Sequence, residues 1–410
     1  MTGHMRLGFH APETVEELAH LVAEAADTRT PLEVMGRGTK REVGRSGSGA
    51  VVSTEGMVGA QLYEPSELVL VVQTGSTVSE VEALLAENEQ ELPFEPVDLG
   101  PVLGYGPGEG TIGGVIGANL SGSRRILKGA ARDHVLGVKA VNGSGEIIKS
   151  GGRVLKNVTG YDLGRTLVGT WGTLAIVTEV ALKVLPAQHE SRTVICFGLT
   201  DQTAIEALCI AMGTPFEVSG TLHMHAGLAR RMSDEDIAGA GASVTAVRVE
   251  NFPASARYRA TRLRQTLQAY GPVLELDTER SRAFWTEVRT LRMFQGTTRP
   301  LWRVSTVPTC AAKLVGSLAR KIEVGVTYDW SGGLVWIETP PLTDAGAVDI
   351  RRTLAEFDGH ATLIRAEAAT RAGIDVFQPL DLPIAKLTAK LKHAFDPLGI
   401  LNPGRLYQGL

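Results

Sequence analysis

Hydrophobic and polar positions along the first 90 residues alternate between helical and strand periods. Apolar residues recur at every third or fourth position from Val15 to Ala25, just after Pro12, and this spacing predicts an amphipathic helix. Short apolar runs of strand length follow at Leu32–Met35, Ala50–Thr54 and Leu68–Gln73. Strands that alternate with helices in this way predict a small α/β unit.

The next 90 residues combine loops, helices and a strand pair. Thr77 and Glu80 have the spacing of a capping box, which predicts a helix from there through Leu85. Residues 93–110 are rich in proline and glycine, so we expect a loop, and Thr111–Leu120 is expected to form a helix of small residues. The other predicted elements are strands at Val135–Val141 and Glu146–Lys149, a helix within Lys156–Val168 and a strand that ends at Leu185.

The character of the sequence changes at Pro186, where glycine becomes scarcer and arginine more frequent, and we expect a domain boundary there. Beyond it, a helix is predicted over Ala254–Tyr270. Its arginines lie off the apolar stripe, where they form either a solvated face or a face that docks a partner: Arg257, Arg259, Arg262 and Arg264.

Composition argues against several classes of protein. The 41 basic and 45 acidic residues give a net charge of −4, whereas a dedicated nucleic-acid binder normally has a basic excess. No apolar run approaches the roughly 18 residues of a membrane span, and the first residues lack a signal-peptide core, so we expect a soluble cytoplasmic protein. The three cysteines, Cys196, Cys209 and Cys310, lack the spacing of an iron–sulfur or cysteine-type zinc site.

Glycine is unusually frequent, at 47 of 410 residues, and it is crowded into the first 180 or so. Glycine is useful where backbone approaches a ligand or turns with positive φ. The run Gly36-Arg37-Gly38-Thr39-Lys40 directly follows a predicted strand, so its amides, hydroxyl and cationic groups could converge on a phosphate. An ordinary glycine turn between two strands is the alternative.

A second glycine-rich run, Gly110-Thr111-Ile112-Gly113-Gly114, opens the predicted helix of small residues. A helix N-terminus attracts anions, and small residues let a bulky planar ligand lie directly against backbone. The alternative is a close helix–helix contact, because a helix so rich in glycine is intrinsically weak.

The same region contains a GxGxxG pattern at Gly108, Gly110 and Gly113. It lacks the apolar strand that precedes the dinucleotide fingerprint of a Rossmann fold, so we reject that fold. Two phosphate-binding loops without a Rossmann unit indicate instead a dinucleotide bound between two subdomains.

Taken together, the motifs resemble those of the vanillyl-alcohol oxidase/p-cresol methylhydroxylase (PCMH) superfamily of FAD-binding flavoproteins. They are the two glycine-rich runs, Ala131–Gly137, Asn142-Gly143 and Gly172–Glu179. Lys156–Leu163 and Phe395–Arg405 resemble the glycolate and D-lactate branch, in particular the FAD-binding subunits of bacterial glycolate oxidases. The resemblance is strong up to residue 186 and at the end of the chain, and between them it rests on position alone.

This resemblance implies an α+β protein with three parts. A PCMH-type FAD-binding domain of two α/β subdomains would span residues 1–186, an α+β cap for substrate or partner would span 187–385, and a C-terminal segment, 386–410, would pack back on the FAD domain. The two glycine-rich runs would hold the pyrophosphate of FAD. The other implied cofactor contacts are Asn119, Ser121, Gly122, Arg132 and Asp133 along the cofactor channel, Ile176 and Val177 at the adenine half, and Asn402 near the isoalloxazine.

The sequence departs from the family in two places. No histidine lies between His20 and His134, where members with covalent flavin carry one, so non-covalent FAD is implied. The HxGDGNxH metal motif of catalytic D-2-hydroxy-acid enzymes is missing. His223 and His225 form the nearest histidine pair, without a neighbouring acidic residue in sequence, so we expect no metal site and can assign no catalytic residue.

The resemblance thus implies an FAD-dependent oxidoreductase that acts on the CH–OH group of a small 2-hydroxy acid. The chain would be the FAD-binding subunit of a glycolate oxidase complex, alongside a second FAD-fold catalytic subunit and an iron–sulfur subunit that takes the electrons. Any contact with the inner face of the membrane would come through these partners. Because the metal motif is missing, we expect the isolated chain to oxidise glycolate or D-lactate negligibly.

Three alternatives stay open. A self-sufficient FAD oxidase or dehydrogenase would need a base and a carboxylate clamp in the cap, for which Arg299, Arg303, Lys313 and Tyr328 are candidates. A non-catalytic scaffold subunit would keep the fold, with or without FAD. An NAD(P)H-dependent enoyl reductase of cell-wall synthesis shares the fold but is disfavoured by Asn402-Pro403-Gly404.

Overall fold

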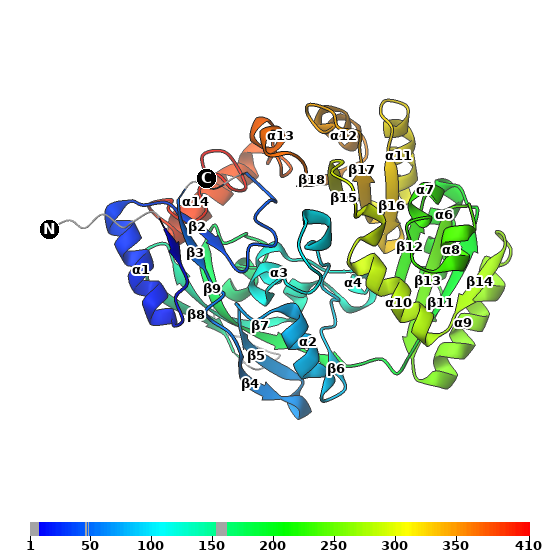
Figure 1. The fold of residues 1–410 in the computed structure, drawn as a ribbon, viewed down its shortest axis with the longest axis horizontal. Helices are drawn as coiled ribbons and strands as arrows, with labels where there is room; N and C mark the ends of the chain where they lie inside the picture. Colours follow the sequence, from blue (N-terminus) through cyan, green and yellow to red (C-terminus); the bar gives the residue numbers. More distant parts are fainter. Residues whose placement is uncertain (1–7, 46, 48, 153–161) are drawn as a thin grey trace. The chain divides into compact units, whose positions relative to one another are not determined.

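The computed structural model describes residues 8–45, 47, 49–152 and 162–410, which form two units (Figure 1). The first unit contains the described residues up to Ser121, together with Gly129–Ala187 and Pro379–Leu410. The second contains Gly122–Lys128 and Gln188–Gln378.

These bounds differ from the sequence-based division in two respects. The C-terminal part of the first unit begins at Pro379 and not at residue 386, so it includes all of the last helix. A short segment, Gly122–Lys128, leaves the first unit and belongs to the second. No change in composition marks that segment in the sequence.

Two sheets form the framework of the first unit. A parallel sheet has the order β1-β3-β2, an antiparallel sheet has the order β4-β5-β9-β7-β8, and β6 pairs with β10. The strands are β1 (Phe9–His10), β2 (Leu32–Met35), β3 (Ala50–Ser53), β4 (Ala60–Glu64), β5 (Val69–Gln73), β6 (Gln90–Glu91), β7 (Val135–Asn142), β8 (Ile147–Gly151), β9 (Ala175–Lys183) and β10 (Leu185–Pro186). The predicted strands and the 135–149 hairpin are therefore present.

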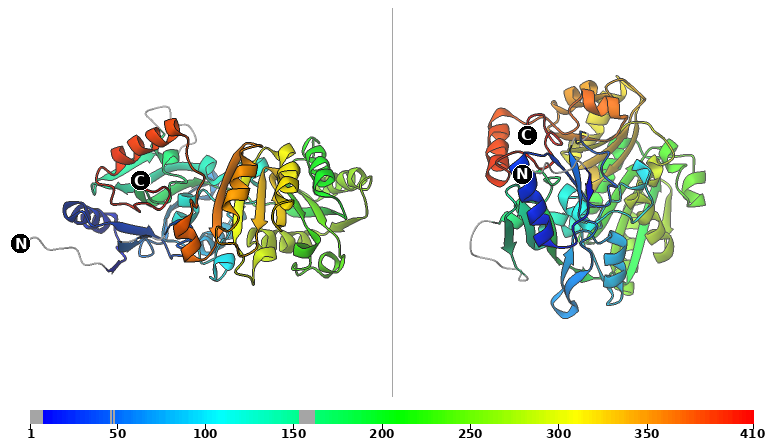
Figure 2. Two further views of the ribbon diagram at one scale, coloured as in Figure 1. Left: turned by 90° about the horizontal axis from the view of Figure 1, so that it is seen from above. Right: turned by 60° about the vertical axis from the view of Figure 1, so that its left-hand side comes forward.

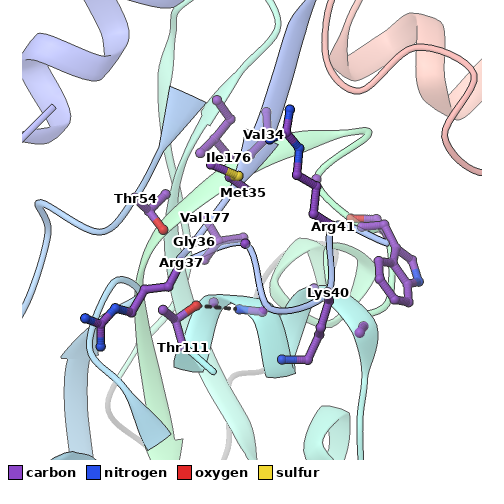
Figure 3. Close-up of a pocket in the computed structure, with 18 of the residues that line it drawn as sticks. Val34, Met35, Gly36, Arg37, Lys40, Arg41, Thr54, Thr111, Ile176 and Val177 are labelled. Atoms are coloured by element: carbon purple, nitrogen blue, oxygen red, sulfur yellow. Dashed lines mark hydrogen bonds between the residues drawn. The ribbon is translucent and has the colours of Figure 1, made fainter. Parts of the chain in front are cut away.

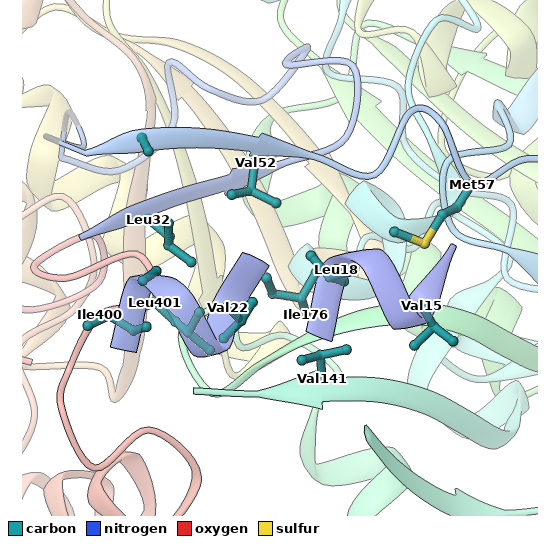
Figure 4. Close-up of a cluster of buried hydrophobic side chains, with 12 residues drawn as sticks. Val15, Leu18, Val22, Leu32, Val52, Met57, Val141, Ile176, Ile400 and Leu401 are labelled. Atoms are coloured by element: carbon teal, nitrogen blue, oxygen red, sulfur yellow. The ribbon is translucent and has the colours of Figure 1, made fainter. Parts of the chain in front are cut away.

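Helix α1 (Val15–Thr28) packs between the parallel sheet and β7 (Figure 4). It begins at Thr14, whose side chain accepts a hydrogen bond from the Glu17 amide at 3.2 Å. Its apolar stripe joins the buried cluster of Val15, Leu18, Val22, Ala25, Leu32, Ala50, Val52, Met57, Val141, Ile176, Ile400 and Leu401. Residues from both ends of the chain therefore share one core.

Three further helices follow in the first unit. Helix α2 (Val78–Ala86) begins with the predicted capping box of Thr77 and Glu80. Helix α3 (Ile112–Ala118) is shorter than predicted because Asn119 takes the left-handed conformation, φ 49°, and ends it. Helix α5 (Leu163–Thr166) occupies the end of the predicted 156–168 element, whose residues 156–161 lie outside the described part.

The last helix, α14 (Leu382–Phe395), lies beside the ends of β7 and β9 (Figure 2, red). The Lys392 ammonium anchors it. This buried group donates hydrogen bonds to the carbonyls of Thr173 and Leu401, at 2.7 and 2.8 Å, and to the Asp396 carboxylate at 2.7 Å. Beyond α14, Leu401 forms a parallel bridge with Leu32 at the edge of β2.

The second unit is built on one antiparallel sheet of eight strands, in the order β14-β11-β13-β12-β16-β17-β15-β18. The strands are β11 (Glu190–Phe197), β12 (Val218–Met224), β13 (Val244–Asn251), β14 (Val273–Leu276), β15 (Leu301–Thr306), β16 (Gly325–Asp329), β17 (Leu334–Glu338) and β18 (Gly359–Arg365). The α+β class predicted from the sequence is thus confirmed.

The helices of this unit are α4 (Arg125–Lys128), α6 (Asp201–Met212), α7 (Ala226–Ala229), α8 (Glu235–Gly239), α9 (Pro253–Leu267), α10 (Thr278–Arg289), α11 (Ala311–Ala319), α12 (Ala347–Leu354) and α13 (Ala368–Gly373). Helix α9 is the predicted arginine-rich helix. Two of its arginines form ion pairs within the unit, Arg257 with Glu190 and Arg259 with Glu217, so they have intramolecular partners. None of the helices in the described residues combines the length and apolar composition needed to span a membrane.

Candidate cofactor-binding site

The first unit contains a pocket of about 760 Å³, counted with the part that opens to solvent (Figure 3). Three stretches meet there: the loop after β2, the helix α3 and the turn that leads into β9. The lining residues are Val34–Arg41, Thr54, Thr111, Gly113, Gly114, Gly117, Ala118, Leu167, Thr170–Gly172, Ala175–Val177 and Arg405.

The first glycine segment (Gly36–Lys40) offers a row of free donors to this pocket. Within the described residues, the backbone N–H groups of residues 37–40 donate no hydrogen bond, although this loop lines the pocket. Gly38 has φ 80°, a conformation that glycine adopts without strain. Consecutive unpaired amides at such a turn form a concave site for an anion.

Lys40 adds a positive charge to the same place. Its side chain is 8% exposed, and its ammonium forms no hydrogen bond or ion pair with any residue in the described ranges. Burial lowers the pKa of Lys40 to about 8, although the Asp98 carboxylate acts in the opposite direction. An ammonium held this way lacks the partner that buried charges normally have, and a bound phosphate would supply it.

The second glycine segment (Gly110–Ala118) contributes differently from the prediction. The first amides of α3 are already paired: Ile112 donates to the Ser76 carbonyl at 2.9 Å and Gly113 to the Thr74 carbonyl at 2.8 Å. Gly114 donates to the Thr111 hydroxyl at 3.1 Å. The helix therefore presents no free first-turn amide to the pocket, and the expected capture of phosphate by these donors is not what the geometry supports.

Because its glycines lack side chains, this segment lets other groups lie close to its backbone. A Cβ built on Gly110 or Gly114 would lie 3.1 or 3.3 Å from Lys40 Nζ, so the ammonium rests directly against these glycines. A Cβ on Gly36 would overlap the side chain of Thr111, which shows how tightly the two segments meet. A Cβ on Gly117 would meet no atom within 4 Å, although this glycine lines the pocket. Gly117 therefore borders open pocket space.

Ile176 and Val177, both predicted as cofactor contacts, also line the pocket. They begin β9, and the Val177 carbonyl accepts a hydrogen bond from the Thr74 hydroxyl at 2.7 Å. The pocket thus brings ten of the predicted residues together: Gly36, Arg37, Gly38, Thr39, Lys40, Thr111, Gly113, Gly114, Ile176 and Val177.

Other residues predicted to contact the cofactor lie outside the pocket lining and form hydrogen bonds with other parts of the chain. Asn119 accepts a hydrogen bond from the Arg132 amide at 3.2 Å, and Ser121 accepts one from the Ala131 amide at 2.9 Å. Asp133 caps the turn that begins at Ala130. Gly110 and Ile112 flank the lining residues of α3, and Gly122 belongs to the second unit, where its carbonyl accepts a hydrogen bond from the Trp330 indole.

Asn402 is likewise absent from the lining. Its side-chain oxygen accepts a hydrogen bond from the Val34 amide at 2.8 Å. Its side-chain nitrogen donates to the carbonyls of Val34 and Trp171, at 3.2 and 2.7 Å. The amide uses both of its N–H groups and one acceptor position to join two walls of the pocket, which is a positioning role.

Sequence reasoning missed several lining residues. Trp171, at φ 54°, stands in the turn before β9, and Gly169 and Gly172 on either side were the available signal. Arg405 lines the pocket from the C-terminal segment. It donates a hydrogen bond to the Lys40 carbonyl at 3.0 Å, and its guanidinium carbon lies 5.6 Å from the centre of the Trp171 ring. Arg405 thus supports the loop that carries the free amides.

The histidine pair noted in the sequence, His223 and His225, meets a carboxylate that sequence spacing did not reveal. His223 and His225 both direct Nε2 at Asp201, at 3.3 and 3.0 Å, and the Tyr328 hydroxyl donates to the same carboxylate. Burial alone would raise the pKa of Asp201, but these hydrogen bonds outweigh it and hold the pKa far below its usual range. Within the described ranges, no three His, Cys, Asp or Glu side chains are arranged to hold a metal ion.

Comparison with known proteins gives a consistent result. The FAD binding domain family matches residues 7–151. Glycolate oxidase subunit GlcE of Escherichia coli is 30% identical over 396 residues, which cover 96% of this chain and 98% of that protein. A D-lactate dehydrogenase of Archaeoglobus fulgidus is 29% identical over 181 residues, 44% of this chain and 39% of that enzyme.

Solved structures show the same fold at low sequence identity. A crystal structure of p-cresol methylhydroxylase with substrate bound superposes with a TM-score of 0.72 and 14% identity, covering 97% of this chain and 88% of that one.

Proposed function

Because the chain belongs to the family of FAD-linked oxidoreductases that includes glycolate oxidase subunit GlcE, we propose that it is the FAD-binding subunit of a complex that oxidises a small 2-hydroxy acid. The proposed complex also contains a second FAD-fold catalytic subunit and an iron–sulfur subunit. We place it in the cytoplasm, with any membrane contact made through the partners.

One observation carries the assignment: four amides and a buried Lys40, none of them paired with any residue in the described part of the chain, meet at one pocket. These groups fit the pyrophosphate of FAD, which carries negative charge and several acceptor oxygens. Gly117 and Ala118 leave space for a planar group, and Ile176 and Val177 supply an apolar wall. The sequence has no histidine between His20 and His134, where family members with covalent flavin carry one, so we propose that FAD is held non-covalently.

When bound, FAD supplies a flavin ring that accepts a hydride from the α-carbon of the hydroxy acid. The residues of this pocket bind and orient. Lys40 stays protonated against the phosphates, Arg405 fixes the Lys40 carbonyl, and Asn402 fixes Trp171 beside them. A geometry held by such supporting hydrogen bonds is what positions a cofactor for reaction.

Two measurements on the purified protein test the proposal. Acid precipitation should release all flavin colour into the supernatant, and colour that stays in the pellet would contradict non-covalent binding. Anaerobic mixing with glycolate or D-lactate should leave the flavin absorbance of the isolated chain nearly unchanged, and addition of both partner subunits should bleach it. Fast bleaching without partners would favour the self-sufficient enzyme, whereas a protein that takes up no FAD would favour a scaffold.

A further inference from the structure

Arginines that enter the interior of the second unit are normally held by carboxylates. Glu250, itself 5% exposed, receives Arg124 at 2.7 Å and Arg248 at 3.4 Å. Glu338, 3% exposed, receives Arg365 at 3.4 Å and Arg231 at 3.7 Å. This arrangement follows the general rule that buried charges are paired.

Arg303 in β15 breaks this rule. Its side chain is half-buried, yet it forms no hydrogen bond or ion pair with any described residue. Asp329 is the acidic group whose charge acts on Arg303, and its carboxylate has other partners. Its carboxylate accepts short hydrogen bonds from the Ser123 hydroxyl and the Trp330 amide, both at 2.6 Å.

A second cation reinforces the charge at this place. The guanidinium carbons of Arg125 and Arg303 lie 4.5 and 5.4 Å from the centre of the Trp330 ring. Burial, together with the charge of Arg125, lowers the pKa of Arg303 to about 10, while Asp329 opposes the shift. The two cations repel each other, and an anion bound beside them would offset that repulsion.

The surroundings of Arg303 leave an approach from solvent. His360 in β18 pairs with Ser305, two residues along β15 from Arg303, so their side chains are on one face of the sheet. His360 is exposed. Although the residue as a whole is exposed, partial burial of its ring and the charges of Arg303 and Arg125 lower the pKa of His360 below its usual value.

The local charge selects the kind of anion. Arg303, Arg125 and Asp329 together carry a charge of +1, which one carboxylate balances and a phosphate dianion exceeds. A guanidinium also presents parallel N–H groups that match the two oxygens of a carboxylate. Of the four candidates named from the sequence, Arg299 and Tyr328 have carboxylate partners and Lys313 is exposed. Arg303 alone has the required geometry.

We propose that Arg303, supported by Arg125 across the Trp330 ring, binds the carboxylate of a small monocarboxylic acid on the second unit. The inference rests on the proposed function, because the 2-hydroxy acid is the monocarboxylate that reaction needs. The chain would then anchor the substrate itself, through side chains of the second unit, and the partner subunits would supply what the site lacks.

The probe for this site is oxamate, a monocarboxylate with no hydride to donate, and ethyl oxamate is its neutral counterpart. Calorimetry on the purified FAD-loaded chain at fixed ionic strength should detect one oxamate per chain and no binding of ethyl oxamate. Arg303→Gln should weaken oxamate binding by about ten- to a hundredfold. Arg303→Lys keeps the positive charge but lacks the two parallel N–H donors of a guanidinium, so its oxamate affinity should lie between those of the parent and Arg303→Gln.

Arg299→Gln is the matched control, because Arg299 already pairs with Glu323 at 3.1 Å, and it should bind oxamate within about twofold of the parent. FAD content and thermal midpoint show whether each variant is folded. Unchanged affinity in a folded Arg303→Gln variant would overturn the proposal. So would equal binding of ethyl oxamate, or tighter binding of phosphate than of oxamate.

The outcome is separable from that of the proposed function, because oxamate binding needs no flavin reduction. If glycolate and D-lactate fail to bleach the flavin even with partners present, the proposed function fails. The carboxylate site still stands or falls on the Arg303 variants alone.

Discussion

The two glycine segments of the first unit border one pocket and serve it in opposite ways. The first glycine segment leaves four amides unpaired and adds the charge of Lys40. In the second glycine segment, the first amides already donate hydrogen bonds to Thr74, Ser76 and Thr111. This segment therefore offers the ligand a surface without side chains. The comparison teaches that glycine content marks a ligand site, whereas the hydrogen bonds that remain unmade show which groups can hold the ligand.

The largest effect on FAD binding is expected from filling the space beside Gly117. Gly117→Phe attaches a ring at a Cβ position that would have no atom of another element within 4 Å, so we expect the ring to enter the pocket space and to displace the cofactor. We expect affinity for FAD to fall more than a hundredfold, with a thermal midpoint no lower than that of the FAD-free parent, since glycine inside a helix is unfavourable by about 0.5–1 kcal/mol. The ratio of flavin to protein absorbance measures this, and a full complement of FAD would contradict the assigned space.

Removing the charge from the first glycine segment should have the next largest effect. Lys40→Met should weaken FAD binding by roughly ten- to a hundredfold, the value of about 1.5–3 kcal/mol for a hydrogen bond to a charged group. Stability of the FAD-free protein should stay the same or rise, because an unpartnered buried ammonium is removed.

Arg37→Met is the matched control for that variant. Arg37 lines the same pocket, but its guanidinium points away from the Lys40 ammonium (Figure 3). We expect a change in FAD affinity of less than about threefold, as for an exposed charge. Equal losses in the two variants would mean that general positive charge, and not Lys40, holds the phosphates.

The pKa of Lys40 predicts a pH dependence of smaller size. The FAD-free chain holds the Lys40 proton with a pKa of about 8, and bound phosphate favours the charged form. Affinity should therefore be constant below pH 8 and fall as pH rises, by up to about tenfold per unit, until it reaches that of Lys40→Met. Fluorescence titration of FAD from pH 7 to 10 checks this, and the variant should show a flat profile.

The same shift has an effect of opposite sign on stability. The pKa of Lys40 is lower in the folded chain than the ordinary 10.5 of the unfolded one. Between these values the unfolded chain binds more protons, so the free energy of unfolding of FAD-free protein should rise with pH in that window. Lys40→Met should abolish this contribution.

The smallest effect on FAD affinity is expected at Gly113, within the second glycine segment. A Cβ there would lie 2.9 Å from both the Cβ and the carbonyl oxygen of Thr74, so a side chain would disturb packing and not the ligand. Gly113→Ala should lower the free energy of unfolding by about 1–3 kcal/mol, as overpacking does, while FAD affinity of the folded protein changes less than about twofold. A strong loss of affinity at unchanged stability would reverse the roles of Gly113 and Gly117.

The sequence predicted those elements whose cause is local. Helix α1, strand β2, the Thr77–Glu80 capping box and the 135–149 hairpin all follow from spacing and turn residues that lie next to one another. The first glycine segment, predicted to bind phosphate, lines a pocket in the structure, and its contact with phosphate stays a prediction.

What the sequence could not predict depends on contacts between distant residues. The Thr74 and Ser76 carbonyls occupy the amides of α3, and that pairing across a loop leaves no local signal. The amide of Asn402 reaches Val34, 368 positions earlier, and so turns a suspected ligand contact into a structural tie. Arg124 pairs with Glu250 because the segment Gly122–Lys128 belongs to the second unit. The composition of that segment does not indicate this.

Because the ribosome makes the chain from its N-terminus, the contacts of Leu401 with Leu32 and of Arg405 with Lys40 form late in synthesis. Strand β2 and the first glycine segment emerge early, but Leu401 and Arg405, which complete them, follow only after all of Gln188–Gln378 has been made. Domains generally fold in the order of their synthesis, yet here the first unit must wait for the second. Until then Leu32 lacks its packing contacts with the C-terminal segment, and the pocket lacks the side chain of Arg405. Loading of the cofactor is therefore a late event in the life of the nascent chain, and a polypeptide halted before Arg405 would emerge colourless.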